Sequence, residues 1–413
     1  MPLPPEIWRE IVRLATYTPT CFDTSPHPDE WNPLSEEFIE LYEANFRTKR
    51  ALAFVSRQIH HITLGFLCDV LVIESLDYDP AHGVICKQLG RITPLIPFLR
   101  TTQHLLVDFI SHDYIDEIAQ SLEQILRQCH NLRGLYLGFP GVGALELVDA
   151  QLSLYGIAVQ TQIAMAVCPG LQFLDIRGQI WENVYTNLLN RVSSNLRSHQ
   201  MSAWARNMKN EFNIAMTPHH PEEIILPQLS SCHWLTNRGT NLSFSKFHMS
   251  SLTYLVIGIP SPRDILSEIL QSASDSISTL RLERPCAVDY DVLSLALRAP
   301  RLQLLAYPIF RGSVAWLTNE LHHDTLREVS VEYDLYHNPF GTPEEILRDH
   351  FHPISAARFP MLSTVTLMPM DGPHNVLGVY DLENGERLED GDTFRPIKLY
   401  LRGMRTTISK EKV

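Results

Sequence analysis

The residue patterns that most often carry catalysis are absent from this sequence. It has no GxxxxGK loop followed by Ser or Thr to cradle phosphates, no GxSxG motif to expose a serine nucleophile and no HExxH pair to bind zinc. Glu389 and Asp390 are adjacent, but they lie in an acidic, glycine-containing stretch typical of a solvated loop. We therefore predict no general acid, base or nucleophile, no cofactor site and no enzymatic activity.

A glycine-rich segment, Gly138 to Gly143, follows a predicted strand at the place where a dinucleotide-binding loop would begin. The third glycine of the GxGxxG pattern falls on Glu146, whose carboxylate would repel a pyrophosphate. We interpret the segment as a turn between structural repeats.

Histidines occur in close pairs that could suggest a metal site. The pairs are His60–His61, His219–His220, His322–His323, and His350 with His352. Adjacent rings do not share a helix face as residues i and i+4 do, and no Cys, Asp or Glu recurs at a ligand distance from them. The pattern favours exposed or capping histidines, so no metal site is predicted.

Composition places the chain among globular proteins. With 413 residues, 45% of them hydrophobic, it can bury the core of two or three structural units, which excludes disorder along its whole length. The formal net charge of -13 argues against a nucleic-acid-binding surface. The seven cysteines lie at least 18 residues apart, which indicates free thiols in a reducing compartment. The N-terminus has no signal-peptide pattern and no apolar run spans a membrane, so we expect a cytoplasmic or nuclear protein without membrane partners.

Residues 1–67 are predicted to form a helical module. Apolar residues recur at helical spacing from Leu3 to Ala15, and again over residues 34–46 and 48–67. Between the first two patterns, Thr18 to Pro33 contains four prolines and predicts an exposed loop. The segment from about 16 to 49 is thus a long acidic, proline-rich insertion.

Residues 68–413 show a repeated pattern of a leucine, an apolar residue three positions later and another two further on. The segments with this pattern begin at Leu132, Leu171, Leu252, Ile277, Leu302, Leu326 and Leu362, with less regular ones at Leu67 and Thr102. Between 252 and 326 the starts are 25, 25 and 24 residues apart, as in leucine-rich repeats. The gap from 171 to 252 is too wide for one repeat, and a strand around Cys232 could fill part of it.

The predicted fold class is α/β, with an N-terminal helical module followed by an irregular, leucine-rich-repeat-like solenoid. Each unit has one apolar strand face that only stacked neighbours can bury, which favours a curved sheet of parallel strands. We expect strands near residues 105, 135, 174, 255, 280, 305, 329 and 365. An ordinary α/β domain whose strands happen to begin with leucine is the alternative.

Two N-terminal stretches share a pattern with a known docking module. LPPEIWREI at residues 3–11 is similar to an opening LPxEΦ helix, and ALAFVSRQI at residues 51–59 is similar to a later segment around Val-Cys/Ser-Arg. Both patterns resemble the F-box, which docks a Skp-type adaptor in a cullin-RING ubiquitin ligase, and the whole layout resembles F-box proteins of mushroom-forming fungi. The resemblance implies that the adaptor would contact Leu3, Pro4, Ile7, Leu52, Val55 and Ser56.

The resemblance implies a non-catalytic substrate receptor of an SCF-type (Skp–cullin–F-box) ubiquitin ligase, whose repeat domain would hold a protein substrate. A concave parallel sheet presents one residue from each strand to such a partner. The candidate substrate-surface residues are Tyr136, Phe173, Asp175, Tyr254, Arg281, Glu283, Arg327, Glu328 and Glu332. Their mixed charge and aromatic content suit a protein partner.

Two other functions remain open at the level of sequence. The chain could be a repeat scaffold unconnected to ubiquitin, in which residues 1–67 merely cap the solenoid. It could also be an enzyme whose site is assembled from distant positions. Exposure of Leu3, Ile7 and Val55 would argue against the simple cap, and a deep pocket that gathers histidines and carboxylates would favour the enzyme.

Overall fold

The computed structural model describes most of the chain, in two compact units. Unit 1 comprises Met1–Leu229 with Thr240–Leu242, and unit 2 comprises Ser230–Gly239 with Ser243–Val413. The described residues are 4–16, 36–73, 99–108, 115–138, 160–206, 223–235, 244–283, 286, 288–309, 321–333, 358–369 and 378–381. The expected loop from Thr18 to Pro33 lies outside them.

Three helices form the N-terminal module of unit 1: α1 (Pro5–Ala15), α2 (Glu36–Ala53) and α3 (Arg57–Leu67). Pro5 opens α1, where the backbone NH that proline lacks would have no partner in any case. The prediction of one helical pattern over residues 48–67 was wrong, because one helix ends at Ala53 and the next begins at Arg57. There the Ser56 side chain accepts a hydrogen bond from the Ile59 backbone NH and begins α3 as its N-cap.

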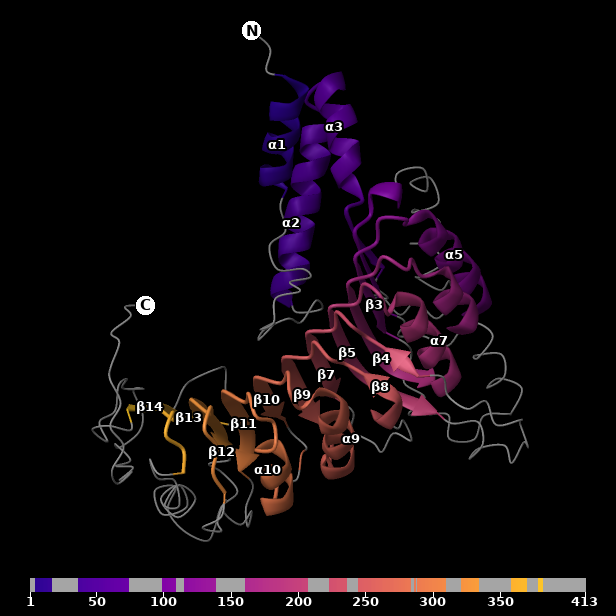
Figure 1. The fold of residues 1–413 in the computed structure, drawn as a ribbon. Helices are drawn as coiled ribbons and strands as arrows, with labels where there is room; N and C mark the ends of the chain where they lie inside the picture. Colours follow the sequence, from indigo (N-terminus) through magenta and orange to yellow (C-terminus); the bar gives the residue numbers. More distant parts are fainter. Residues whose placement is uncertain are drawn as a thin grey trace, which may run out of the picture. The chain divides into compact units, whose positions relative to one another are not determined.

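Five parallel strands follow in unit 1, in the sheet order β1-β2-β3-β4-β5. They are β1 (Val70–Ile73), β2 (His104–Asp108), β3 (Gly134–Gly138), β4 (Phe173–Trp181) and β5 (Ser198–Arg206). Helices α5 (Ile115–Gln128) and α7 (Glu182–Val192) lie on the same side of these strands (Figure 1). A short strand, β6 (Ile224–Ile225), comes later in this unit.

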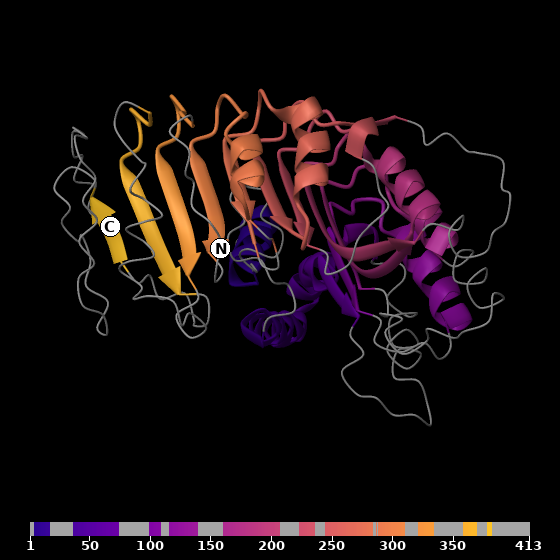
Figure 2. The ribbon, with the colours of Figure 1, turned by 90° about the horizontal axis from the view of Figure 1, so that it is seen from below.

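Unit 2 continues the same architecture. Its sheet order is β7-β9-β10-β11-β12-β13-β14. The strands are β7 (Ser231–Leu235), β9 (Tyr254–Gly258), β10 (Thr279–Leu282), β11 (Leu304–Ile309), β12 (Glu328–Tyr333), β13 (Thr364–Pro369) and β14 (Gly378–Asp381). Helices α9 (Arg263–Ala273) and α10 (Tyr290–Ala296), the turn η2 (Phe244–Lys246) and the short strand β8 (Phe247–His248) complete the described elements. All these sheet pairings are parallel except the last, in which β14 runs against β13 (Figure 2).

The predicted strands are confirmed, and so is their parallel pairing. All eight predicted positions, from 105 to 365, fall within β2, β3, β4, β9, β10, β11, β12 and β13. The strands at 255, 280 and 305, which the solenoid reading required to be parallel, pair in register as Leu255, Leu280 and Leu305. These three leucines are fully buried, as expected when each repeat buries the apolar strand face of the next.

Backbone turns repeat with the strands and link each repeat to the next. The carbonyl of Thr253 accepts hydrogen bonds from the NH groups of Ser278 and Thr279, and the carbonyl of Ser278 accepts from Gln303 and Leu304. Hydroxyl groups reinforce the same turns, since Ser278 Oγ donates to the Thr253 carbonyl at 3.1 Å. These turn contacts hold neighbouring repeats together.

Strand β5 lacks the predicted apolar pattern because a histidine replaces the usual apolar residue. Its repeat begins at Leu196, 25 positions after Leu171, with His199 in the ladder position. His199 Nδ1 lies 3.0 Å from the Leu174 carbonyl oxygen, and its Nε2 lies 2.8 Å from the Tyr185 hydroxyl of α7. Both ring nitrogens are thus hydrogen-bonded, which allows a polar side chain in the core. The expected strand around Cys232 is β7.

Candidate protein-interaction surfaces

Helix α1 carries a stripe of exposed apolar side chains. Ile7, Ile11 and Leu14 are four and three residues apart, which places them on one face of the helix. Their exposed fractions are 47%, 39% and 62%. Val12, on another face, is fully buried. The helix therefore uses one face for the module's interior and leaves a second apolar face to solvent.

The turn between α2 and α3 exposes a second set of apolar side chains. Phe54 is 83% exposed and Val55 is 63% exposed. Solvent-exposed apolar side chains of this size on a small module are typical of interaction sites. This turn and the α1 stripe are both candidates for docking a partner.

The predicted adaptor residues fall into these two regions. Ile7 and Val55 are exposed, as expected, whereas Leu52 is half-buried. Pro4 and Ser56 are exposed and also have local roles, because the Pro4 carbonyl accepts the first α1 hydrogen bonds and Ser56 caps α3. Leu3 lies outside the described residues. Adaptor contact by this set stays a prediction.

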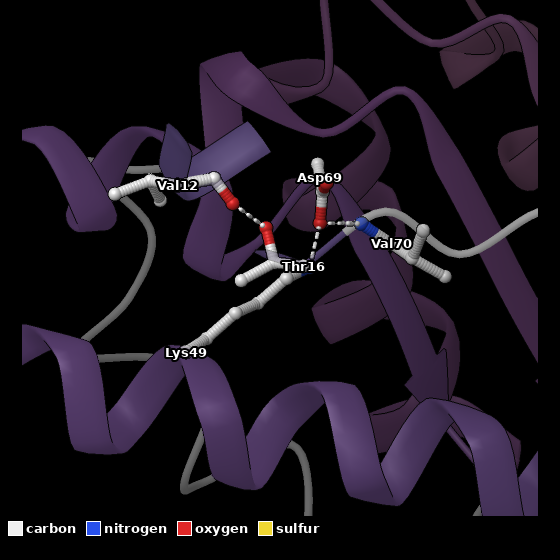
Figure 3. Close-up of polar contacts among 5 residues, drawn as sticks. All are labelled: Val12, Thr16, Lys49, Asp69 and Val70. Carbon is white, nitrogen blue, oxygen red and sulfur yellow. Dashed lines mark hydrogen bonds and ion pairs between the residues drawn. The ribbon is translucent and has the colours of Figure 1, made fainter. Parts of the chain in front are cut away.

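A buried ion pair joins the helical module to the first strand. Lys49 of α2 donates a hydrogen bond to Oδ1 of Asp69, the residue before β1 (Figure 3). Only 3% of the lysine side chain is exposed. The same oxygen accepts the Val70 backbone NH at 2.8 Å. The Asp69 carbonyl accepts the NH groups of Gln103 and His104 from the next repeat. One residue thus connects α2, β1 and the turn before β2.

Three of the candidate substrate-surface residues in unit 1 are buried rather than exposed. Tyr136, Phe173 and Asp175 have exposed fractions of 1%, 2% and 0%. Strands in a sheet lie about 5 Å apart, so large side chains on one face cover one another. Arg177 adds to this cover, because its guanidinium carbon lies 5.0 Å from the centre of the Tyr136 ring. Their role at a substrate surface stays a prediction.

The candidates in unit 2 are more accessible, with one exception. Tyr254 is 2% exposed and lies against His233, with ring centres 5.4 Å apart. Arg327 is exposed, whereas Arg281, Glu283, Glu328 and Glu332 are half-buried. These side chains place both signs of charge on the strands and turns of unit 2.

Of the described histidines in the predicted pairs, only His323 is buried. His60, His61 and His322 are exposed. His323 is buried, with Nε2 2.8 Å from the Ala299 carbonyl oxygen, and its Nδ1 accepts the backbone NH of Leu326. No group of three or more His, Cys, Asp or Glu side chains within the described ranges is arranged to hold a metal ion. The His219, His220, His350 and His352 side chains lie outside those ranges.

The described cysteines are free thiols, and the buried ones are not activated as nucleophiles. They are Cys68, Cys129, Cys168, Cys232 and Cys286. Burial raises the pKa of Cys68 to about 11 and the pKa values of Cys129 and Cys232 to about 12. A thiol must lose its proton to act as a nucleophile, so these buried groups are unreactive near neutral pH.

Asp175 should make the stability of the protein depend on pH. Burial raises its pKa to about 7, although Arg177 acts in the opposite direction. Because this pKa is above the unfolded value of about 3.9, the stabilisation from the neutral carboxyl is fully present below pH 4. It is lost as the pH rises through 7.

We therefore expect the parent protein to lose about 2 kcal/mol of stability between pH 5 and pH 8. The Asp175→Asn variant should not show this loss, because the amide stays neutral. Thermal melts of both proteins at the two pH values measure this difference. The exposed Asp275→Asn variant is the control and should melt in parallel with the parent protein. The prediction would be contradicted if the difference in melting temperature between the Asp175→Asn variant and the parent protein were the same at pH 5 and pH 8.

No protein-family model and no curated protein matches the chain. Solved structures with weak similarity to it do exist. The leucine-rich-repeat-containing protein LegL7 from Legionella pneumophila aligns with 68% of this chain and 80% of its own, at 14% identity and a TM-score of 0.34. TLR13 in its complex with ssRNA13 aligns with 65% of this chain at 12% identity and a TM-score of 0.27, and the alignment spans about half of TLR13, 49%.

The pairing of the strands defines the class of this protein. It is an α/β protein built from parallel strands that recur with a buried leucine ladder. Leucine-rich-repeat proteins are among the solved structures similar to it. In the part of the chain that the structure describes, no helix is long and apolar enough to cross a membrane.

Proposed function

We propose that this protein is a non-catalytic interaction scaffold whose N-terminal module docks a Skp-type adaptor and whose parallel strands hold a protein substrate. In this proposal it acts as the substrate receptor of an SCF-type ubiquitin ligase, and the adaptor links it to the cullin-RING enzyme. Stacked parallel strands support the substrate role, since such sheets form extended binding surfaces. The proposal includes a cytoplasmic or nuclear location and no nucleic-acid or membrane partner.

The observation that carries this proposal is the exposure of apolar side chains on a module that resembles the F-box. Ile7 and Val55 are 47% and 63% exposed, and both belong to the stretches with that resemblance. Leaving such side chains in water is unfavourable by about 25 cal/mol for each Å² of apolar area. A partner that buries them would recover this free energy. An adaptor with an apolar docking groove fits that requirement.

We expect the double substitution Ile7→Asp and Val55→Asp to abolish adaptor binding. Two carboxylates in an otherwise dry contact would weaken binding by several kcal/mol, through the penalty for desolvating charge. The measurement is a pull-down with the purified Skp-type adaptor of the host, together with a thermal melt of each variant. Met165→Asp changes an equally exposed apolar residue outside the module and is the matched control.

Retained binding by a folded double variant would refute the F-box assignment. A variant that loses both binding and its melting transition would show instead that Ile7 and Val55 stabilise the module. In that case the exposed Phe54→Asp variant, with a normal melt, provides the decisive binding measurement.

A scaffold unconnected to ubiquitin is the second candidate, and the Lys49–Asp69 pair favours it. This ion pair ties α2 directly to β1, the first strand of the sheet. Repeat proteins need such a terminal cap to shield their first repeat from solvent. If the parent protein does not bind the purified adaptor, while the α1–α3 module remains necessary for folding, the cap function is the correct one.

A further inference from the structure

Arg177 in β4 is held in place by two side chains on the same face of the sheet. Its Nε lies 3.4 Å from Asp175 Oδ2, two residues earlier in the strand. Its guanidinium carbon lies 5.0 Å from the centre of the Tyr136 ring on β3. Tyr136 and Asp175 are aligned partners in the β3–β4 register, so the three side chains form one cluster. The contact at Nε is an ion pair without a hydrogen bond, so charge attraction and a cation–π contact hold the guanidinium beside Tyr136 and Asp175.

Part of the Arg177 side chain remains exposed. Its exposed fraction is 29%, and Nε is buried. Asp175 is fully buried, and neither of its oxygens has a hydrogen-bond partner among the described residues. Asp175 therefore acts on the cluster through its ion pair with Arg177 and not through hydrogen bonds, and it does not itself contact a ligand.

Strand β5 adds neutral polar side chains beside the cluster. Gln200 is aligned with Asp175, and Ser202 is aligned with Arg177. Both are half-buried, and alternation along the strand places them on the face that carries the cluster. An amide and a hydroxyl are donors that can bind an oxygen next to the guanidinium.

We propose that Arg177 anchors a carboxylate side chain from an acidic segment of a protein partner on this face of unit 1. That the partner is a protein rests on the proposed function. The new element is the acidic chemistry of that partner. The two terminal nitrogens of a guanidinium match the two oxygens of a carboxylate, so one arginine suffices for a bidentate contact. Tyr136 and Asp175 position the arginine, and Arg177 contacts the ligand.

A carboxylate fits the cluster better than a phosphate or a cation does. Phosphate groups are usually bound by several arginines, and here a single arginine lies beside an acidic residue. A dianion would be repelled more strongly by an ionised Asp175 than a carboxylate would. A cationic ligand would have to displace Arg177 to reach Asp175, which has no exposed surface.

The test uses the full-length protein and three labelled peptides of matched length: GEEGEEG, GQQGQQG and GKKGKKG. Fluorescence anisotropy gives the dissociation constant of each at constant ionic strength. The parent protein should bind the acidic peptide about tenfold more tightly than the amide peptide, as expected for hydrogen bonds to charged groups. Its net charge of -13 opposes any non-specific binding of the acidic peptide.

Arg177→Gln should remove this preference, and Arg177→Lys should reduce it, because an ammonium group keeps the charge but loses the planar fork. Arg301→Gln removes one positive charge from an exposed position in unit 2 and should leave the preference intact. Thermal melts establish that each variant is folded.

Three results would overturn the proposal: no preference for the acidic peptide in the parent protein, an equal preference in a folded Arg177→Gln variant, or tighter binding of the basic peptide. Adaptor binding is measured separately through the N-terminal module. Loss of adaptor binding with retained peptide preference would contradict the proposed ligase function alone.

Discussion

Replacing Leu280 with alanine should destabilise the protein by about 3 kcal/mol, the usual effect of removing a large apolar side chain from a packed core. Leu280 is fully buried at the centre of unit 2, aligned with Leu255 on one side and Leu305 on the other. The substitution leaves a cavity between two neighbouring repeats, which weakens both interfaces. Urea unfolding followed by circular dichroism measures the effect.

Met361→Ala is the matched control for this experiment. Met361 belongs to the same unit and is 47% exposed, so its removal should change the stability by less than about 0.5 kcal/mol. A loss of less than about 1 kcal/mol for Leu280→Ala would show that the leucine ladder is not the core of unit 2.

Replacing Lys49 with methionine should destabilise unit 1 by about 2 kcal/mol. Methionine fills much of the same volume, but it leaves the Asp69 carboxylate without its charged partner. Breaking one side of a fully buried pair is unfavourable by about 3–5 kcal/mol. Asp69 is 24% exposed, so water compensates for part of this loss. The expected signature is earlier unfolding of the α1–α3 module in urea.

An exposed ion pair on the same helix provides the control. Arg47 and Glu43 are 3.3 Å apart, with 74% and 60% of their side chains exposed. Arg47→Met should therefore change the stability by less than about 0.5 kcal/mol. Equal stability of the Lys49 and Arg47 variants would mean that the module is not fastened to β1 through Asp69.

The repeated strands were predictable from the sequence because each one begins with the same buried pattern. The first residues of the repeats in unit 2, such as Leu252, Ile277 and Leu302, are all fully buried. A period of about 25 residues reflects one strand and its return connection, so spacing alone locates the next strand. The parallel pairing of β9 to β13 follows, because these successive strands all begin at the same edge of the sheet.

Strand β5 escaped prediction because its core position holds His199. A search for apolar ladders cannot detect a polar residue whose hydrogen bonds come from elsewhere in the fold. Here the two partners are Leu174, in the previous strand, and Tyr185, in α7. A leucine at position 196, 25 residues after the previous start, was the remaining signal.

The interaction surfaces were only partly predictable. Exposure of Ile7 and Val55 was expected from the F-box resemblance, since a face that docks an adaptor cannot also be filled by the protein's own core. Arg177 was missed because no repeat pattern marks it, and its position depends on contacts with Tyr136 and Asp175 across two strands. Burial of those two side chains depends on neighbouring strands, which a single sequence does not specify.

The most direct test of the proposed docking function is hydrogen–deuterium exchange of the full-length protein with and without the purified Skp-type adaptor. Docking through the N-terminal module predicts slower exchange in α1 and in the turn from Phe54 to Ser56 when the adaptor is present. Exchange in strands β9 to β13 should not change. Unchanged exchange in α1 and that turn at saturating adaptor, or protection confined to the strands, would contradict it.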